Sequence, residues 1–186
     1  MVKATGYLYR NISFDDRPLW PLCDRKNMKQ CYIIILNYKK WDETLDCIRS
    51  VFESDYTGFK VIAIDNDSGN RSLECIMDAL EQEPVKKTGF DLPAGTALMD
   101  PQSFALMGAA VLPDISLVQN QRNGGFAAGN NVVIRSLMGE DAWLWLLNPD
   151  MTVDRHALTE MIRCGQQSPS GIVAAVHRSF YQPDKI

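Results

Sequence analysis

The stretch Trp143–Asp154 reads Trp-Leu-Trp-Leu-Leu-Asn-Pro-Asp-Met-Thr-Val-Asp and decides how the fold is read. Its opening run of large apolar residues is typical of a short strand buried on both faces, as at the centre of a parallel sheet. Pro149 has no backbone N–H to donate, so pairing is expected to stop there. Asp150 would then follow the carboxyl end of a central strand, where open α/β sheets bind ligands. An acidic group there suits a divalent cation that also holds a phosphate, although Asn-Pro-Asp is equally ordinary turn chemistry.

Length and composition indicate one soluble globular domain. The chain has 186 residues, of which 46% are hydrophobic and 23% charged. Its formal net charge of −4 argues against a nucleic-acid binder, which normally carries a basic stripe. Five scattered cysteines without a CxxC pair suggest reduced thiols and a cytoplasmic location. No apolar stretch approaches the ~20 residues that a membrane-spanning helix needs, and no signal peptide is predicted. Peripheral association with the inner face of a membrane and the oligomeric state remain open.

Strand-like and helix-like patterns alternate along most of the chain. Short apolar runs predict five strands: Cys31–Leu36, Lys60–Ile64, Ile115–Val118, Trp143–Leu147 and Gly171–Val176. Helical spacing predicts four helices: one capped by Asp42, one over Leu73–Leu80, one over Phe126–Met138 and one capped by Asp154. This alternation predicts right-handed crossovers and therefore an α/β fold, with a mostly parallel, Rossmann-like sheet covered by helices on both faces.

Two segments do not follow this alternation of strands and helices. Residues 1–30 are mixed in character and are interpreted as an N-terminal extension without a motif. Residues 82–113 contain four prolines and no sustained period, which predicts an insertion at one edge of the sheet, with a short helix within Ser103–Val111. The main domain is accordingly predicted to span residues 31–180.

Polar residues follow the predicted strands at the points where each strand ends. They are Asn37, Asp65 with Asn66, the turn Asn123–Gly125, and Asn148 with Asp150. Because the carboxyl ends of parallel strands share one edge, these residues are expected to converge on one crevice. Each alone is normal for a βα loop, but together they favour a nucleotide site. The chain has no GxGxxG after its first strand and no P-loop, which argues against a dehydrogenase or a P-loop enzyme.

Four motifs together resemble one known family. They are Ile33-Ile34-Ile35-Leu36-Asn37-Tyr38, Val61-Ile62-Ala63-Ile64-Asp65-Asn66, Asn123-Gly124-Gly125-Phe126-Ala127-Ala128-Gly129-Asn130-Asn131 and Trp145-Leu146-Leu147-Asn148-Pro149-Asp150. In this order they are similar to the motifs of family 2 glycosyltransferases, and the closest branch is the rhamnosyltransferase-like proteins of polysaccharide assembly. The resemblance covers roughly residues 31–176.

The resemblance implies a GT-A fold that binds a nucleoside-diphosphate sugar, a UDP- or dTDP-sugar, with Mg²⁺ or Mn²⁺. It places Asn148-Pro149-Asp150 at the DxD position, so that Asp150 is the expected metal ligand. The other implied nucleotide-sugar-binding residues are Asn37 and Tyr38 in the base pocket, Asp65 on the base, Asn66 beside it, and Asn123, Gly125 and Asn130 along the nucleotide.

The resemblance also implies a part that this sequence does not supply. In the family, a carboxylate of a later, acceptor-binding half acts as catalytic base, and beyond Asp150 only Asp154, Glu160 and Asp184 are available. The chain is therefore expected to be the donor half of an inverting hexosyltransferase that acts on a polysaccharide or glycolipid acceptor, and its catalytic base stays unknown.

Two alternatives remain open. One is an inactive nucleotide-sugar-binding fragment or interaction module that lacks the acceptor half. The other is a nucleotidyltransferase, which commonly carries a glycine-rich basic loop after its first strand, whereas residues 37–40 have lysines and no glycine. His156 is interpreted as solvated, Trp143 and Trp145 as core residues, and His177 as a weak candidate for a metal ligand.

Overall fold

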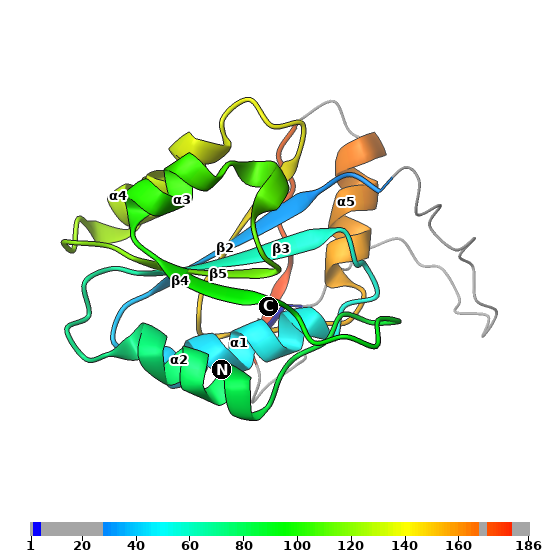
Figure 1. Ribbon diagram of the computed structural model, residues 1–186. Helices are drawn as coiled ribbons and strands as arrows, with labels where there is room; N and C mark the ends of the chain where they lie inside the picture. Colours follow the sequence, from blue (N-terminus) through cyan, green and yellow to red (C-terminus); the bar gives the residue numbers. More distant parts are fainter. Residues whose placement is uncertain (1, 5–27, 168–170, 180–186) are drawn as a thin grey trace.

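A computed structural model describes residues 2–4, 28–167 and 171–179 of the chain. At its centre lies a five-stranded sheet in the order β4-β5-β3-β2-β6, with all neighbouring strands parallel. The bounds of these strands are Thr96–Met99 (β4), Ile115–Gln119 (β5), Phe59–Asp65 (β3), Cys31–Asn37 (β2) and Trp143–Leu147 (β6). Helices cover both faces, with α1 and α2 on one side and α3 and α4 on the other (Figure 1). The predicted parallel α/β architecture is confirmed.

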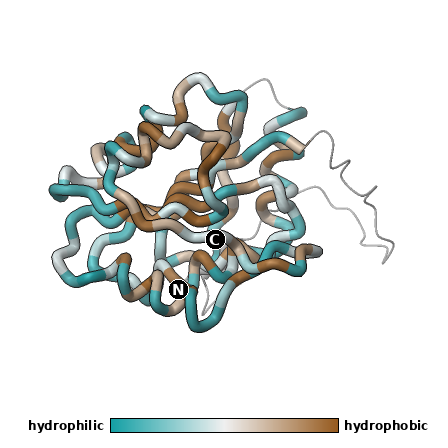
Figure 2. The backbone as a smooth tube through the Cα atoms, in the orientation of Figure 1, coloured by the Kyte–Doolittle hydropathy of each residue, from teal (hydrophilic) through white to brown (hydrophobic). Residues whose placement is uncertain are grey.

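The strands β2 and β3 form the centre of the core. Their side chains are almost all buried, because helices cover them above and below. On one face, β2 and β3 pack against α1 (Trp41–Phe52), α2 (Ser72–Gln82) and α5 (Ala157–Gln167). On the other face they pack against α3 (Pro101–Met107) and α4 (Gly125–Ile134), which are followed by the short 3-10 turns Ala109–Val111 and Arg135–Leu137. Hydrophobic residues accordingly concentrate in the central strands, while the loops around them are hydrophilic (Figure 2).

The helix after β2 begins differently from the prediction. Lys40, and not Asp42, is its N-cap, and no side chain caps the helix. Asp42 lies inside the first turn, where its negative charge still favours the positive end of the helix. The N–H of Lys40 instead donates to Asn37 Oδ1 at 3.2 Å, so the turn is held by the residue that ends β2.

The position of β6 differs from the predicted central strand that is buried on both faces. The strand exists as predicted, but it pairs only with β2 and lies at the edge of the five-stranded sheet. Leu144 and Leu146 are 41% and 46% exposed, so the strand is not buried on both faces. Trp143 and Trp145 point to the other face and pack against the core there, which confirms their assignment as core residues.

A second, three-stranded sheet was not predicted. It has the order β7-β1-β8 and consists of Met151–Val153 (β7), Val2–Ala4 (β1) and His177–Ser179 (β8). Within residues 1–30, interpreted as an N-terminal extension without a motif, Val2–Ala4 forms the strand β1, while residues 5–27 lie outside the described residues. The strand predicted over Gly171–Val176 is wrong, since that stretch has no regular structure and the strand follows it.

The segment 82–113 is more regular than its prolines suggest. It supplies the edge strand β4, which pairs with β5, and then α3, which begins at Pro101 and is capped by the carboxylate of Asp100. The Lys60 ammonium from β3 donates to the carbonyl oxygens of Ala109 and Leu112 and fastens the segment to the sheet. The predicted short helix is thus confirmed, although it begins two residues earlier than Ser103.

The described part of the chain contains no helix long and apolar enough to span a membrane.

Candidate functional site

The strands β2 and β3 end side by side in a buried polar network. Their last residues, Asn37 and Asp65, are register partners, and their side chains are 0% and 2% exposed. Asn37 Nδ2 donates to Asp65 Oδ1 at 2.5 Å, and Asn37 Oδ1 accepts the hydroxyl of Thr44 from α1 at 2.9 Å. The predicted convergence of these two strand ends is therefore observed as a direct contact.

Both oxygens of the Asp65 carboxylate are fully engaged. Besides Asn37, Oδ1 accepts the Ser68 hydroxyl at 2.5 Å, while Oδ2 accepts the Ser68 backbone N–H at 2.9 Å. Oδ2 also accepts Gln119 Nε2 from the end of β5 at 3.0 Å. Gln119 is the exposed member of this group, so its hydrogen bond is the one that a ligand can replace most easily.

A second network joins β3 to the turn before α4. Asn66 Nδ2 donates to Asn123 Oδ1 at 2.9 Å, and Asn123 Oδ1 also accepts the N–H of Gly125 at 2.9 Å. Asn120 Nδ2 donates to Asn66 Oδ1 at 3.1 Å. Gly125 has φ +83°, a conformation that L side chains rarely adopt, so the turn requires glycine there. These contacts unite three of the predicted site residues.

The α4 helix packs closely over the same region. A Cβ at Gly129 would lie 2.6 Å from Leu36 Cδ1 and 3.1 Å from Asn66 Oδ1, so only glycine allows this approach. Asn130 is buried and donates from Nδ2 to the Phe126 carbonyl at 2.9 Å, which makes it a support of α4 in this structure.

Tyr38, Asn148 and Asp150 line the open side of this edge. Tyr38 is 44% exposed, and the Lys39 ammonium lies 5.0 Å from the centroid of its ring. Asn148 and Asp150 are exposed in the loop after β6, and the carbonyl of Asn148 accepts the thiol of Cys47 from α1 at 3.6 Å. Burial raises the pKa of the Cys47 thiol to about 12, and the negative charge of Asp150 contributes to this increase.

The residues that complete these networks were not predicted. Thr44, Ser68, Gln119 and Asn120 carry polar side chains of types common in loops and helices, and no pattern marks Thr44 and Ser68 as buried. A usable signal exists for Gln119 and Asn120, because they directly follow the buried run of β5 as Asp65 follows that of β3.

The two histidines are placed as their residue types suggest. His156 Nδ1 lies 2.7 Å from Asp55 Oδ2 and is exposed, in agreement with a surface role. His177 is exposed in β8, in the small sheet. Among the described residues, no group of three or more His, Cys, Asp or Glu side chains is arranged to hold a metal ion.

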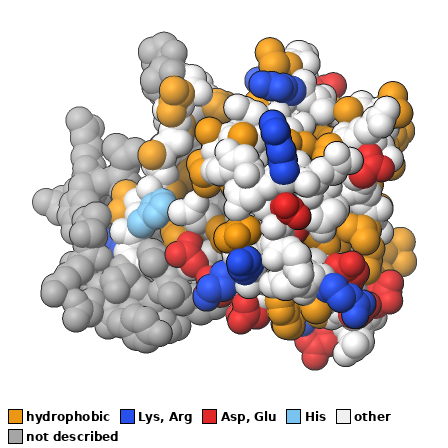
Figure 3. Space-filling view, turned by 90° about the vertical axis from the view of Figure 1, so that its left-hand side faces the viewer, with side chains coloured by type: hydrophobic (Ala, Val, Ile, Leu, Met, Phe, Trp, Pro, Cys, Tyr) orange, Lys and Arg blue, Asp and Glu red, His pale blue; other side chains and the backbone are white. Residues whose placement is uncertain are grey.

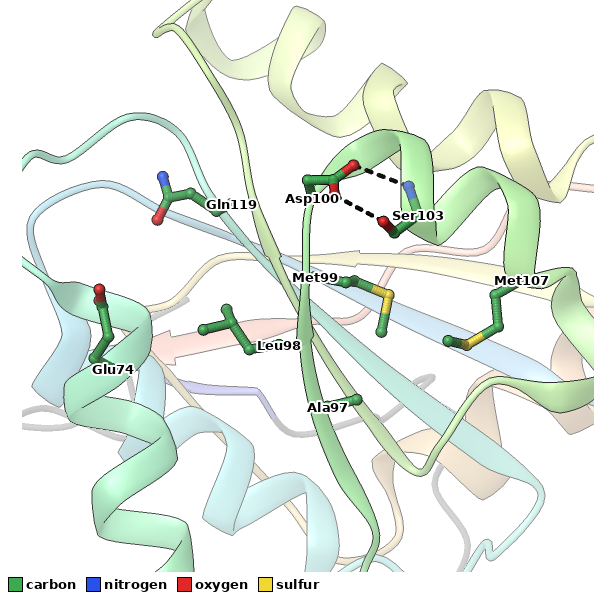
Figure 4. Close-up of a pocket in the computed structure, with 8 residues that line it drawn as sticks. All are labelled: Glu74, Ala97, Leu98, Met99, Asp100, Ser103, Met107 and Gln119. Carbon is green, nitrogen blue, oxygen red and sulfur yellow. Dashed lines mark hydrogen bonds between the residues drawn. The ribbon is translucent and has the colours of Figure 1, made fainter.

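A cavity of about 560 Å³ lies beside the Asp65 network. Its lining comes from the start of α2, from β4 and α3, and from Gln119 (Figure 4). Its lining combines the polar side chains of Glu74, Asp100, Ser103 and Gln119 with apolar side chains of β4 and α3, among them Leu98 and Met107. Since β4 and α3 belong to the segment 82–113, this segment builds a pocket next to the candidate site.

The face at the carboxyl ends of the strands carries both signs of charge. Basic and acidic side chains are interspersed over it and form no single basic patch (Figure 3).

Comparison with solved structures identifies the architecture. The chain is similar to a crystal structure of S. aureus TarS (residues 1–349), with TM-score 0.50 and 14% identity over 74% of this chain and 32% of that one. It is also similar to the Pyrobaculum calidifontis mannosyltransferase PcManGT in complex with GDP-Man and Mn²⁺, with TM-score 0.53 and 14% identity over 77% of this chain and 34% of that one. The chain has a GT-A fold.

The similarity covers only part of each of these structures. The chain spans about a third of the length of these structures. A TarS structure in complex with UDP-GlcNAc matches in the same way, with TM-score 0.50 and 13% identity over 74% of this chain and 31% of that one. No family model matches the chain, and no curated protein does so. The GT-A fold is therefore established by structure, whereas the rhamnosyltransferase-like branch stays a prediction.

Proposed function

We propose that this chain is the donor-binding part of a glycosyltransferase that takes a UDP- or dTDP-sugar. The observation that supports it most is the position of Asn37, Asp65, Asn66, Asn123 and Asp150 at one edge of a GT-A sheet. Open α/β sheets bind ligands outside the carboxyl ends of their strands. TarS and PcManGT, whose structures contain UDP-GlcNAc and GDP-Man, share this architecture. In the proposal, residues 31–180 form the donor domain.

In this proposal, Asp65 selects the base. Uracil and thymine carry an N3–H that a carboxylate can accept, and cytosine has no such proton. Because Oδ2 of Asp65 already accepts Gln119 Nε2, the base replaces this exposed donor and leaves the buried ones in place. Because one hydrogen bond replaces another, the net gain in binding free energy is smaller than that of a new hydrogen bond. We therefore expect UDP to bind about tenfold more tightly than CDP. Tyr38 and Asn37 flank the base, while Gly125 and Asn130 shape the turn and helix beside the nucleotide.

Asp150 is the residue proposed to hold a divalent cation, Mg²⁺ or Mn²⁺. Its carboxylate is exposed and makes no hydrogen bond or ion pair within the described chain, so it is available. Mg²⁺ is commonly bound by one or two carboxylates together with substrate phosphates, and a single aspartate therefore fits this donor set. When bound, the cation neutralises charge on the leaving diphosphate. Asn148 contributes at most a neutral oxygen or a hydrogen bond.

The catalytic base of an inverting transfer is proposed to lie outside the described residues. Asp154 accepts the N–H of His156 at 3.0 Å, and Glu160 pairs with Arg163 at 2.7 Å, so both carboxylates after Asp150 are engaged elsewhere. Asp184 lies outside the described residues. These contacts favour a chain that binds the donor without transferring the sugar to a polysaccharide or glycolipid acceptor by itself.

Calorimetric titration of the 186-residue chain tests the proposal. UDP is expected to bind in the presence of Mg²⁺ or Mn²⁺, about tenfold more tightly than CDP, and EDTA should remove most of the affinity. Asp150→Ala is expected to make the residual affinity indifferent to EDTA. Asp91→Ala, which also removes an exposed loop carboxylate, is the matched control and should keep the metal dependence. Wild-type affinity that does not respond to EDTA contradicts the role of Asp150, and equal affinities for UDP and CDP contradict the role of Asp65.

A further inference from the structure

A groove of about 370 Å³ runs along the outer face of α4. It lies between α4 and the loop that leads into it, and its lining residues are Asn120, Arg122, Gly124, Ala128, Asn131, Val132 and Arg135. No acidic residue lines it, whereas the cavity beside the Asp65 network is lined by Glu74 and Asp100 and by no basic residue. Adjacent residues of the chain line the two cavities, Gln119 the one and Asn120 the other.

Both arginines of the groove are uncompensated. Neither the Arg122 nor the Arg135 guanidinium makes a hydrogen bond or ion pair within the described chain, although the protein is acidic overall with net charge −4. Arg49 and Arg163, by contrast, pair with Glu83 and Glu160. A guanidinium presents a planar fork of donors that matches phosphate oxygens, so two unpaired ones in a single groove favour an anionic occupant.

The start of α4 adds to the positive electrostatic potential of the groove. Its N-cap is Gly124, and its first turn contains no acidic residue. The N–H of Gly125 donates to Asn123 Oδ1, so the helix contributes its positive end and the N–H groups that follow Gly125. Gly124 itself lines the groove.

Most of the groove lies on the face of α4 that points away from the sheet, and it borders the candidate site at Asn120, which donates to Asn66 Oδ1. At about 3.6 residues per turn, Ala128, Val132 and Arg135 share one face of α4. Gly129, Asn130 and Val133 lie on the opposite face and are buried toward the sheet. Asn66 and Leu36 contact the buried face, as the close approach at Gly129 shows.

We propose that this groove binds a phosphate ester at a site distinct from the donor nucleotide. The volume exceeds that of a bare ion and suits a small phosphorylated molecule or the phosphorylated end of a larger one. Arg122 and Arg135 pair with the phosphate from two sides, and the Asn131 amide and the α4 N-terminus supply further donors. The inference does not depend on the proposed function, because it requires only the groove and its charges.

An NMR titration of the ¹⁵N-labelled full chain with inorganic phosphate tests this site. The amide resonances of Gly124, Ala128 and Asn131 are expected to shift in a saturable manner. The shifts should also occur in EDTA, which removes the cation that the proposed nucleotide site requires. Arg122→Gln and Arg135→Gln should each weaken binding about tenfold. Arg163→Gln removes an equal charge from α5 and should leave the affinity unchanged.

A second pair of variants controls for folding and net charge. Ala128→Glu places a carboxylate in the groove and should abolish the shifts, whereas Ala127→Glu makes the same substitution at the neighbouring exposed position outside the lining and should preserve them. Shifts that fail to saturate, or that Ala127→Glu removes equally, overturn the proposal. Loss of the phosphate shifts on saturation with UDP and Mg²⁺ assigns the groove to the donor diphosphate and overturns the claim of a separate site.

Discussion

The two ends of the candidate site differ in how their carboxylates are held. Asp65 is buried between two central strands and accepts four hydrogen bonds from side chains and backbone. Asp150 follows an edge strand, is exposed, and accepts none within the described chain. A carboxylate whose lone pairs are filled organises the loops around it, while one with free lone pairs is available to a cation or another ligand. The same residue type near two strand ends is therefore held in two different ways.

The largest expected effect follows from removing Asp65. Asp65→Ala leaves Asn37 Nδ2, both Ser68 donors and Gln119 Nε2 without their acceptor in a mostly buried setting, and we expect a loss of about 3 kcal/mol or more of unfolding free energy. Asp150→Ala, the same substitution at the exposed end, should change it by no more than about 0.5 kcal/mol. Urea denaturation followed by circular dichroism measures both values. Similar losses for the two variants contradict the comparison.

A smaller effect is expected from the packing that supports the buried end. Gly129→Ala places a Cβ 2.6 Å from Leu36 Cδ1 and 3.1 Å from Asn66 Oδ1, so these side chains or the helix have to shift. We expect a cost of about 1–3 kcal/mol in urea denaturation. Asn131→Ala, at an exposed position of the same helix, is the control and should be neutral or slightly stabilising, because alanine favours the helix. A neutral Gly129→Ala variant would show that α4 does not constrain Asn66.

The smallest expected effect concerns the exposed end. Burial is the main cause that raises the pKa of Cys47 to about 12, and the charge of Asp150 is a lesser one. Asp150→Asn should therefore lower this pKa while leaving it above that of an exposed thiol, as measured by thiolate absorbance. The stability linked to this raised thiol pKa is fully present below the unfolded-state pKa and is lost as the pH rises to about 12. In the variant, the loss is therefore complete at a lower pH and is smaller in total. Asp154→Asn is the control and should leave the Cys47 pKa unchanged.

The buried end was the more predictable of the two. Asn37 and Asp65 each follow a strongly apolar run, and parallel pairing brings such residues together whatever the rest of the sheet does. Their partner Ser68 could not be identified, because serine is common in loops and only the tertiary structure shows that it is held against Asp65. Gln119 did offer a signal, since it ends the buried run of β5.

At the exposed end, the strand before Asp150 was predicted at the correct residues, but its burial on both faces was predicted wrongly. The run Trp143–Leu147 predicts a strand, but hydrophobicity alone cannot distinguish a central strand from an edge strand that is half covered. Strand order depends on which crossovers form, and this information is not local. The strands β1, β7 and β8 have three residues each, too few to show a period, so the small sheet left no signal.

That small sheet determines when Asp150 can reach its final position. The strand β7 begins directly after Asp150, and it pairs with Val2–Ala4, which in turn pairs with His177–Ser179. The strands β2 and β3 are separated in the sequence by a single helix, whereas β1 and β7 lie far apart in the sequence. Pairing β1 with β7 therefore costs more loop-closure entropy than pairing β2 with β3. We expect the central sheet to form first in folding and the loop of Asp150 to be fixed last. During synthesis, the small sheet is therefore complete only after the residues of β8 have left the ribosome.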